Sequence, residues 1–143
     1  KEYLIELTEE LEHVMSFINI QKARFFDRLE IVPDVEDNIQ CLIPPFTLQP
    51  IVDNAIRHGV LKRKQGGIVC ITIKKLPNGV LITIKDNGIG MTGEQLDLLF
   101  KRSSRHHSVY KVNRALKAAG GKGVGIQSAL NEGTIVTMEI PFS

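Results

Sequence analysis

Two pairs of alternating segments constrain the fold of this 143-residue chain more than any other feature of its sequence. Apolar and polar residues alternate over 68–75 and 80–85 with the two-residue period of a half-buried strand, and Pro77-Asn78-Gly79 lies between them. Asn-Gly between such segments is a strong hairpin signal because both residues tolerate positive φ. A second hairpin is expected from 124–128 and 134–140, with its turn at Asn131-Glu132-Gly133. The sheet should therefore be mostly antiparallel.

Helices are expected before and between these strands. Apolar residues recur at three- and four-residue steps over 2–24, which predicts an amphipathic helix. A second helix is predicted over 46–58, started by Pro44-Pro45 and ended by Gly59. The other expected elements are a strand over 28–32, a turn over 33–37, extended chain over 39–43, a short helix opened by a capping box at Thr92 and Gln95, and a helix from Val109 closed by Gly120-Gly121. This order argues for an α+β fold, a two-layer sandwich with helices on one face of a mixed, mostly antiparallel sheet.

Composition limits the possible partners without identifying them. The formal net charge of +2, from 18 basic and 16 acidic residues spread along the chain, gives no electrostatic footprint for nucleic acid. Cys41 and Cys70 lie in apolar segments without CxxC or Cys/His spacing, which favours buried free thiols and a reducing, cytoplasmic setting. No apolar stretch approaches the roughly 20 residues of a membrane helix. Lys1 in place of Met suggests a piece of a longer protein.

The residues before Asp86 direct a carboxylate toward the core. Val80, Ile82 and Ile84 share one face of their strand, and Asp86 continues the same parity. A buried ionised carboxylate needs hydrogen-bond donors, which either the protein or a ligand supplies. The following Asn87-Gly88-Ile89-Gly90 has two glycines that permit positive φ and let the backbone pass close to a flat ligand. The alternative is a tight turn in which Asp86 caps its own loop.

The predicted helix over 46–58 carries polar groups among apolar ones. Asn54 and His58 lie one turn apart on one side, and Asp53 and Arg57 are paired in the same way. Because Asn disfavours a helix interior, Asn54 suggests an oxygen ligand for Mg²⁺, which takes one or two protein groups and fills its shell with water and phosphates. The alternative is a solvated face with an Asp53–Arg57 ion pair.

Thr134 is a further polar residue aimed at the core. It shares the parity of Val136, Met138 and Ile140, so its hydroxyl should point to the core that receives Asp86. The alternative is a threonine present only as a good strand former.

Several strings together resemble one protein family, in the right order. Residues 48–59 (LQPIVDNAIRHG) are similar to the N box of the GHKL, or Bergerat-fold, ATPases in their LytS/YehU-type sensor histidine kinase form. Residues 86–91 (DNGIGM) resemble the G1 box, and the segment from Gly133 to Pro141 resembles the closing strand. Residues 10–25 are also similar to the segment before the catalytic domain in that family. By this resemblance the chain is identified as the C-terminal ATP-binding catalytic domain of such a kinase.

At the adenine end, the resemblance implies that Asp86 accepts the exocyclic amine of the base. Thr134 would support that contact through water. Gly88, Gly90 and Met91 belong to the loop that would pass under the base.

At the phosphate end, the resemblance assigns Asn54 to Mg²⁺ bridging the phosphates of ATP. Asp53 stands where the family usually has Glu, and it would orient or deprotonate the attacking group. Arg57 and His58 would lie close to the phosphates as positive or donor groups of the kind that phosphoryl transfer needs.

The glycine-rich G2 box of the family is missing. Its glycines correspond to Ser104, His106 and Ser108, and Lys111 replaces the usual Asn. Such residues do not easily adopt positive φ or approach phosphate as closely as glycine. The run 121–125 (GKGVG) looks similar to the box, but no helix is expected after it, so it is interpreted as the turn into the last hairpin.

The resemblance implies donation of the γ-phosphoryl group of Mg-ATP to a histidine on upstream helices of the same protein, feeding a response regulator. Residues 1–26 would link from that dimerisation and phosphoacceptor region, and 27–143 would form the ATP-binding domain. His13 lacks the surroundings of a phosphoacceptor. The full-length protein is expected to be homodimeric, with this domain on the cytoplasmic side of a membrane-bound sensor. Two alternatives remain: a degenerate, non-catalytic GHKL module, and an ATPase or serine kinase of another GHKL branch.

Overall fold

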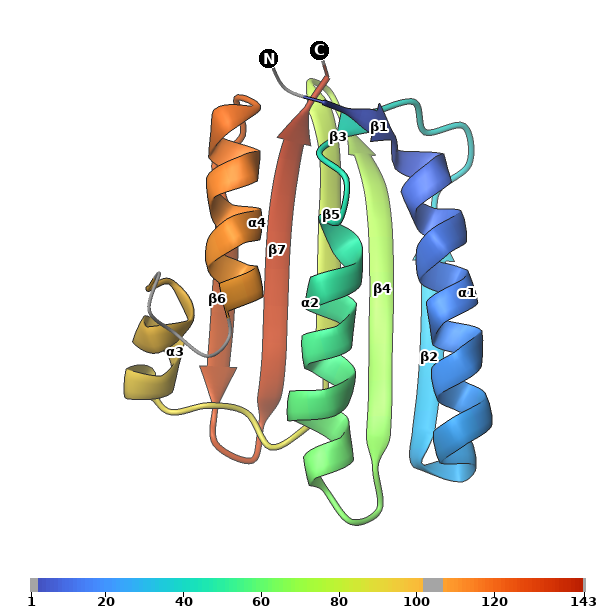
Figure 1. Cartoon of the computed structure of the whole chain (residues 1–143), viewed down its shortest axis with the longest axis vertical. Helices are drawn as coiled ribbons and strands as arrows, with labels where there is room; N and C mark the ends of the chain where they lie inside the picture. The colour runs from blue at the N-terminus through green and yellow to red at the C-terminus, as the bar shows by residue number, and fades with distance from the viewer. Residues whose placement is uncertain (1–2, 102–106, 143) are drawn as a thin grey trace.

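The computed structural model describes residues 3–101 and 107–142, which form a five-stranded sheet of order β2-β4-β5-β7-β6 covered on one face by helices (Figure 1). This is the two-layer α+β architecture expected from the sequence. A separate two-stranded sheet pairs β1 with β3. The elements are β1 (Ile5–Glu6), α1 (Leu7–Phe25), η1 (Phe26–Arg28), β2 (Leu29–Val35), β3 (Leu42–Ile43), α2 (Leu48–Asn54), η2 (Ala55–Gly59), η3 (Val60–Lys62), β4 (Gly67–Leu76), β5 (Gly79–Asp86), α3 (Gly93–Leu99), α4 (His107–Ala118), β6 (Val124–Ala129) and β7 (Gly133–Pro141).

Both expected hairpins are confirmed. β4 and β5 pair antiparallel across the turn at residues 77–78, and β6 pairs antiparallel with β7. β5 also pairs antiparallel with β7, which joins the two hairpins into one sheet. Among the strands of the described residues, β2 alone is parallel to its neighbour, β4, because the chain between them crosses the sheet through α2.

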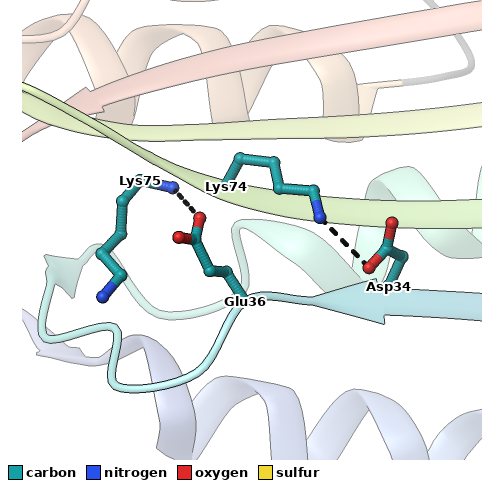
Figure 2. A network of polar contacts seen from close by, with 4 residues as sticks. All are labelled: Asp34, Glu36, Lys74 and Lys75. Carbon is teal, nitrogen blue, oxygen red and sulfur yellow. Dashed lines mark hydrogen bonds and ion pairs between the residues drawn. The ribbon is translucent and has the colours of Figure 1, made fainter.

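The edge strand β2 extends further than expected. The sequence predicted a turn over 33–37, but β2 continues through Pro33 to Val35. Pro33 is tolerated because β2 lies at the edge of the sheet, where an N–H is not needed on the open side. Figure 2 shows what holds the end of the strand: Lys74 Nζ lies 3.2 Å from Asp34 Oδ1, and the backbone N–H of Lys75 donates to Glu36 Oε1 at 2.8 Å.

The predicted helix over 46–58 divides into three parts. Regular α-helix ends at Asn54, a π turn follows over Ala55–Gly59, and a 3₁₀ turn over Val60–Lys62 completes the segment. The expectation that Gly59 ends the helical segment is wrong, because residues Val60–Lys62 after it form a 3₁₀ turn. Gly59 is needed for another reason, which lies at the functional site.

The core lies between the sheet and the helices. Val80, Ile82 and Ile84 of β5 are fully buried, and so are Leu7 and Val14 of α1. α1 begins at Leu7, later than the expected residue 2, because Ile5 and Glu6 pair with β3. Cys41 is buried, Cys70 is half-buried, and both are free thiols.

A buried carboxylate joins α1 to the start of α2. Glu10 is 3% exposed, and its two oxygens accept the backbone N–H groups of Phe46 at 2.8 Å and Leu48 at 2.5 Å. Phe46 has a φ of +61° and an exposed ring. The helix that precedes the sheet therefore fixes the point at which α2 begins.

Among the helices in the described parts of the chain, none has both the length and the apolar character required to cross a bilayer.

Candidate functional site

Asp86 ends β5 with its carboxylate directed into the core. It follows the fully buried Val80, Ile82 and Ile84 on one face and is itself 4% exposed, as the strand parity predicted. Desolvation by burial raises the pKa of Asp86 to about 6, while a hydrogen bond from the Gly88 N–H to Oδ1 at 2.8 Å lowers it. Asp86 thus caps its own loop with one oxygen. Its carboxylate still favours a further donor, because a single hydrogen bond does not replace its lost hydration.

Two glycines bring the backbone against this carboxylate. A Cβ atom on Gly59 would lie 2.9 Å from Asp86 Oδ1, and a Cβ atom on Gly88 would lie 2.2 Å from the carbonyl carbon of Gly59. The Ile89 N–H also donates to the Gly59 oxygen at 3.4 Å. The loop after β5 therefore rests directly on the end of the π turn, and both positions exclude larger residues.

Gly90 turns the same loop under the last hairpin. Its φ is +71°, and a Cβ atom there would lie 1.9 Å from the Ala129 oxygen. Beyond it, the Met91 N–H donates to Ser128 Oγ at 2.9 Å, which ties the loop to β6. Glycine at position 90 is thus required both by backbone conformation and by space.

Thr134 and Asp86 are direct register partners on β7 and β5. Thr134 is 9% exposed, and its Oγ1 lies 2.8 Å from Ser128 Oγ. Ser128 donates to the Gly133 oxygen at 2.9 Å, so the hydrogen between the two hydroxyls belongs to Thr134. The structure therefore brings Asp86, Thr134 and Ser128 together at the ends of three adjacent strands.

The polar residues of the helical segment precede Gly59 in the sequence. Asp53 and Asn54 are half-buried, whereas Arg57 and His58 are exposed. Arg57 Nε lies 3.7 Å from Asp53 Oδ1, so the ion pair considered from the sequence does form. Asn54 is the last residue of α2, and its side-chain amide supplies an oxygen of the kind that Mg²⁺ accepts as a ligand.

The described residues show no preformed cluster of metal-binding side chains. In the described residues no group of three or more His, Cys, Asp or Glu side chains is placed to hold a metal ion. Mg²⁺ fits this arrangement, because it is commonly bound by one or two protein oxygens together with water and substrate phosphates. Asn54 offers one such oxygen.

Three features of the site were missed from the sequence. The π turn of Ala55–Gly59 gives no local signal, although such turns are frequent at functional sites. The contact of Gly59 with Asp86 depends on tertiary packing. Ser128 had a usable signal, because it continues the inward parity of Val124 and Ile126, as Asp86 does on its own strand.

The region of the missing glycines is only partly described. Ser104 and His106 lie outside the described residues, and Ser108 and Lys111 lie on α4. The run 121–125 forms the entry to β6, as predicted: Gly123 has a φ of +91°, and Asn113 Oδ1 accepts the Val124 N–H at 2.8 Å.

Comparison with known proteins gives relatives over the whole chain. The family model described as histidine kinase-, DNA gyrase B-, and HSP90-like ATPase matches residues 46–143. The uncharacterized protein YwpD of Bacillus subtilis (strain 168) is 39% identical over 133 residues, covering 92% of this chain and 48% of YwpD. The sensor protein LytS of Bacillus cereus is 34% identical over 149 residues, covering 99% of this chain and 25% of LytS. The chain thus spans about half the length of YwpD and about a quarter of LytS. The resemblance to LytS-type kinases is confirmed.

Solved structures share the fold. The catalytic domain of histidine kinase ThkA superposes with a TM-score of 0.78 at 16% identity, covering 97% of each chain. Histidine kinase AdeS of Acinetobacter baumannii gives a TM-score of 0.75 at 19% identity, covering 99% of this chain and 67% of the AdeS chain. The arrangement of one sheet and its covering helices is therefore that of known catalytic domains.

Proposed function

We propose that this chain, which belongs to the histidine kinase-, DNA gyrase B-, and HSP90-like ATPases, binds Mg-ATP as the catalytic domain of a LytS-type sensor histidine kinase. The observation that carries the proposal is the buried carboxylate of Asp86 at the junction of the π turn, the loop after β5 and the last hairpin.

Adenine recognition is assigned to Asp86 and its neighbours. The exocyclic amine of adenine supplies the donor that this desolvated carboxylate still requires. Thr134, its register partner, supports the contact through a bridging water. Gly88 and Gly90 keep the loop close enough for the base to lie against its backbone, and Met91, half-buried beside them, offers an apolar contact.

Binding of the ATP phosphates is assigned to polar residues at the end of α2 and in the π turn. The Asn54 oxygen would hold Mg²⁺, and the charge of the bound ion would offset that of the phosphates. Asp53 orients the attacking group, and its pairing with Arg57 keeps the two side chains next to each other. Arg57 and His58 are exposed and supply positive or donor groups toward the γ-phosphate.

Phosphoryl transfer needs an acceptor that this chain does not supply. His13 is exposed on α1, and the acceptor is assigned instead to a histidine on helices of the full-length, homodimeric protein. The bond between the γ-phosphorus and its bridging oxygen breaks, a P–N bond to the imidazole forms, and ADP leaves. A response regulator then receives the group. We propose in addition that the domain lies on the cytoplasmic side of a membrane-bound sensor.

The missing glycines favour one alternative, a degenerate module that no longer turns over ATP. Ser108 lies in α4 where the family has a flexible glycine. Joining the upstream helices to this chain and finding no phosphohistidine in the folded protein would favour this alternative. Steady release of phosphate without an acceptor would instead favour an ATPase or serine kinase of another branch.

The first prediction tests the adenine contact with Asp86→Asn. Aspartate has two acceptor oxygens, one for the Gly88 N–H and one for adenine, whereas the amide has a single acceptor. The variant should bind Mg-ATP about 10-fold or more weakly, as measured by calorimetric titration.

The control is Asp37→Asn, which makes the same change at an exposed position in the loop after β2. It should bind Mg-ATP as the parent does. Unchanged affinity in Asp86→Asn would remove the adenine assignment.

A further inference from the structure

Arg63 joins three segments that are far apart in the sequence. It follows η3, and its guanidinium Nη2 donates to the Gly88 oxygen at 3.1 Å and to the Asn131 oxygen at 3.2 Å. Gly88 belongs to the loop after β5, and Asn131 belongs to the turn between β6 and β7. One cationic side chain therefore ties the end of the helical segment to the loop and to the last hairpin.

Gly88 is the link between Arg63 and Asp86. Its carbonyl accepts from Arg63, and its N–H donates to Asp86 Oδ1 at 2.8 Å. Glycine has more backbone freedom than any other residue, so Gly88 keeps its N–H on Asp86 only while its neighbours restrain it. The Asn131 N–H donates to the Ile89 oxygen at 2.6 Å, which holds the next peptide of the loop. Arg63 therefore restrains the loop at Gly88 and also the turn to which the loop is bonded.

Hydrogen bonds of its backbone N–H and carbonyl groups hold Arg63 itself in place. Its N–H donates to the Val60 oxygen at 3.1 Å, and its carbonyl accepts from the Gly66 N–H at 3.0 Å and from Arg28 Nη2 at 3.1 Å. Within the described residues its Nε is buried without a hydrogen-bond partner. A buried unpaired donor costs about 1–3 kcal/mol, which the two hydrogen bonds of Nη2 must offset.

We propose that Arg63 is a positioning residue for adenine recognition, acting through Gly88 on the orientation of the Asp86 carboxylate. The inference rests on the proposed function, because it takes Asp86 as the group that reads the base. Its consequence is a preference for adenine over a base that lacks the exocyclic amine. Phosphate binding at Asn54 does not depend on Arg63.

The test compares the affinities of the chain for ADP and for IDP, whose hypoxanthine base has no exocyclic amine. Arg63→Gln should weaken ADP binding about 10-fold, the loss of one charge-assisted contact, while IDP binding changes little. The ratio of the two affinities should therefore fall. Lys64→Gln removes the same charge one residue away, at an exposed side chain, and should keep the parent ratio. Arg63→Lys retains the charge and should recover part of the ratio.

The outcomes separate the inference from the proposed function. If the parent chain binds neither ADP nor ATP, the proposed function fails. If Asp86→Asn lowers the ratio but Arg63→Gln leaves it unchanged, only the role of Arg63 is overturned. Equal weakening of ADP and IDP by Arg63→Gln, together with a lower melting temperature, would show a purely structural arginine and would also overturn it.

A second measurement in the parent chain does not depend on how the variants fold. Because binding and positioning are reciprocal, a nucleotide that uses Asp86 must stabilise the Arg63–Gly88 contact. ADP should therefore slow hydrogen exchange at the Gly88 N–H and the Arg63 guanidinium more than IDP does at saturation. Equal slowing by the two nucleotides would contradict the inference.

Discussion

At the scale of single residues, Asp86 combines the proposed contact with adenine with a cost in stability. Its pKa rises from an ordinary 3.8 to about 6 because burial disfavours the charged form. Between these two values the folded protein binds the proton more tightly than the unfolded chain does. The stabilisation from protonated Asp86 is thus fully present below about pH 4 and is lost as the pH rises through about 6.

The same carboxylate leads to a prediction on pH dependence. Asp86→Asn removes the buried charge, so at pH 7.5 its free energy of unfolding should exceed that of the parent by about 1–2 kcal/mol. The difference should shrink as the pH falls toward 4, where Asp86 becomes protonated. Urea unfolding between pH 4 and pH 7.5 measures this difference in the free energy of unfolding. Asp37→Asn should show no such dependence on pH. A variant less stable than the parent at pH 7.5 would contradict the assigned cause of the shift.

Gly90 and Gly93 offer a matched pair of substitutions in one segment. Gly90→Ala places a Cβ atom 1.9 Å from the Ala129 oxygen at a φ of +71°, and should destabilise the protein by about 2 kcal/mol or more. Gly93→Ala meets no atom within 4 Å at the start of α3, and should be neutral or stabilising by up to about 1 kcal/mol. Urea denaturation of the two variants measures both effects; equal losses would show that the position of Gly90 under the hairpin is not what requires glycine.

At the scale of elements, the sequence predicted what is decided locally. The hairpin at Asn78-Gly79 and the capping box at Thr92 depend on residues a few positions apart, and both are confirmed. The inward direction of Asp86 followed from strand parity alone. The same reasoning applied to Ser128 would have found the hydroxyl that holds Met91.

The elements that were predicted wrongly depend on contacts between residues that are distant in the sequence. Pro33 predicts a turn by itself, but the edge position of β2 and the pairing of Lys74 with Asp34 keep the chain extended. Gly59 predicts a helix end by itself, but the approach of Asp86 requires glycine there while helical turns continue. Local propensity is overridden wherever the sheet supplies a stronger constraint.

The contact between α1 and α2 also belongs to this scale. Glu10 satisfies two backbone donors at the start of the segment that carries Asn54. Glu10→Ala should cost about 2–4 kcal/mol, because two buried N–H groups lose their charged acceptor. Glu9→Ala, at an exposed position next to it, should cost less than about 0.5 kcal/mol. Thermal unfolding compares the two, and similar losses would contradict a specific role for the Glu10 carboxylate.

At the scale of the whole molecule, α1 packs as part of the folded unit. Leu7, Val14 and Ile18 are at most 1% exposed against the core. Deleting residues 1–26 should abolish the cooperative thermal transition, because it exposes this apolar face and leaves the start of α2 without Glu10. Deleting residues 1–4 should preserve the transition. A truncated chain that still melts cooperatively and binds ADP would support the division at residues 26 and 27 predicted from the sequence.

β1 and the C-terminal end of β7 lie at one end of the sheet, whereas Asp86 and Thr134 lie at the other (Figure 1). A polypeptide joined at either point would be attached to the domain at the end of the sheet remote from Asp86. β5 has eight residues, so at about 3.4 Å per residue Asp86 lies roughly 27 Å from the opposite end of the sheet. Rotating the sheet by ~10° about that end would move Asp86 by about 5 Å, which is comparable to the distance between two neighbouring strands. A small rotation of the sheet at its attached end would therefore move the proposed nucleotide site toward an acceptor or away from it.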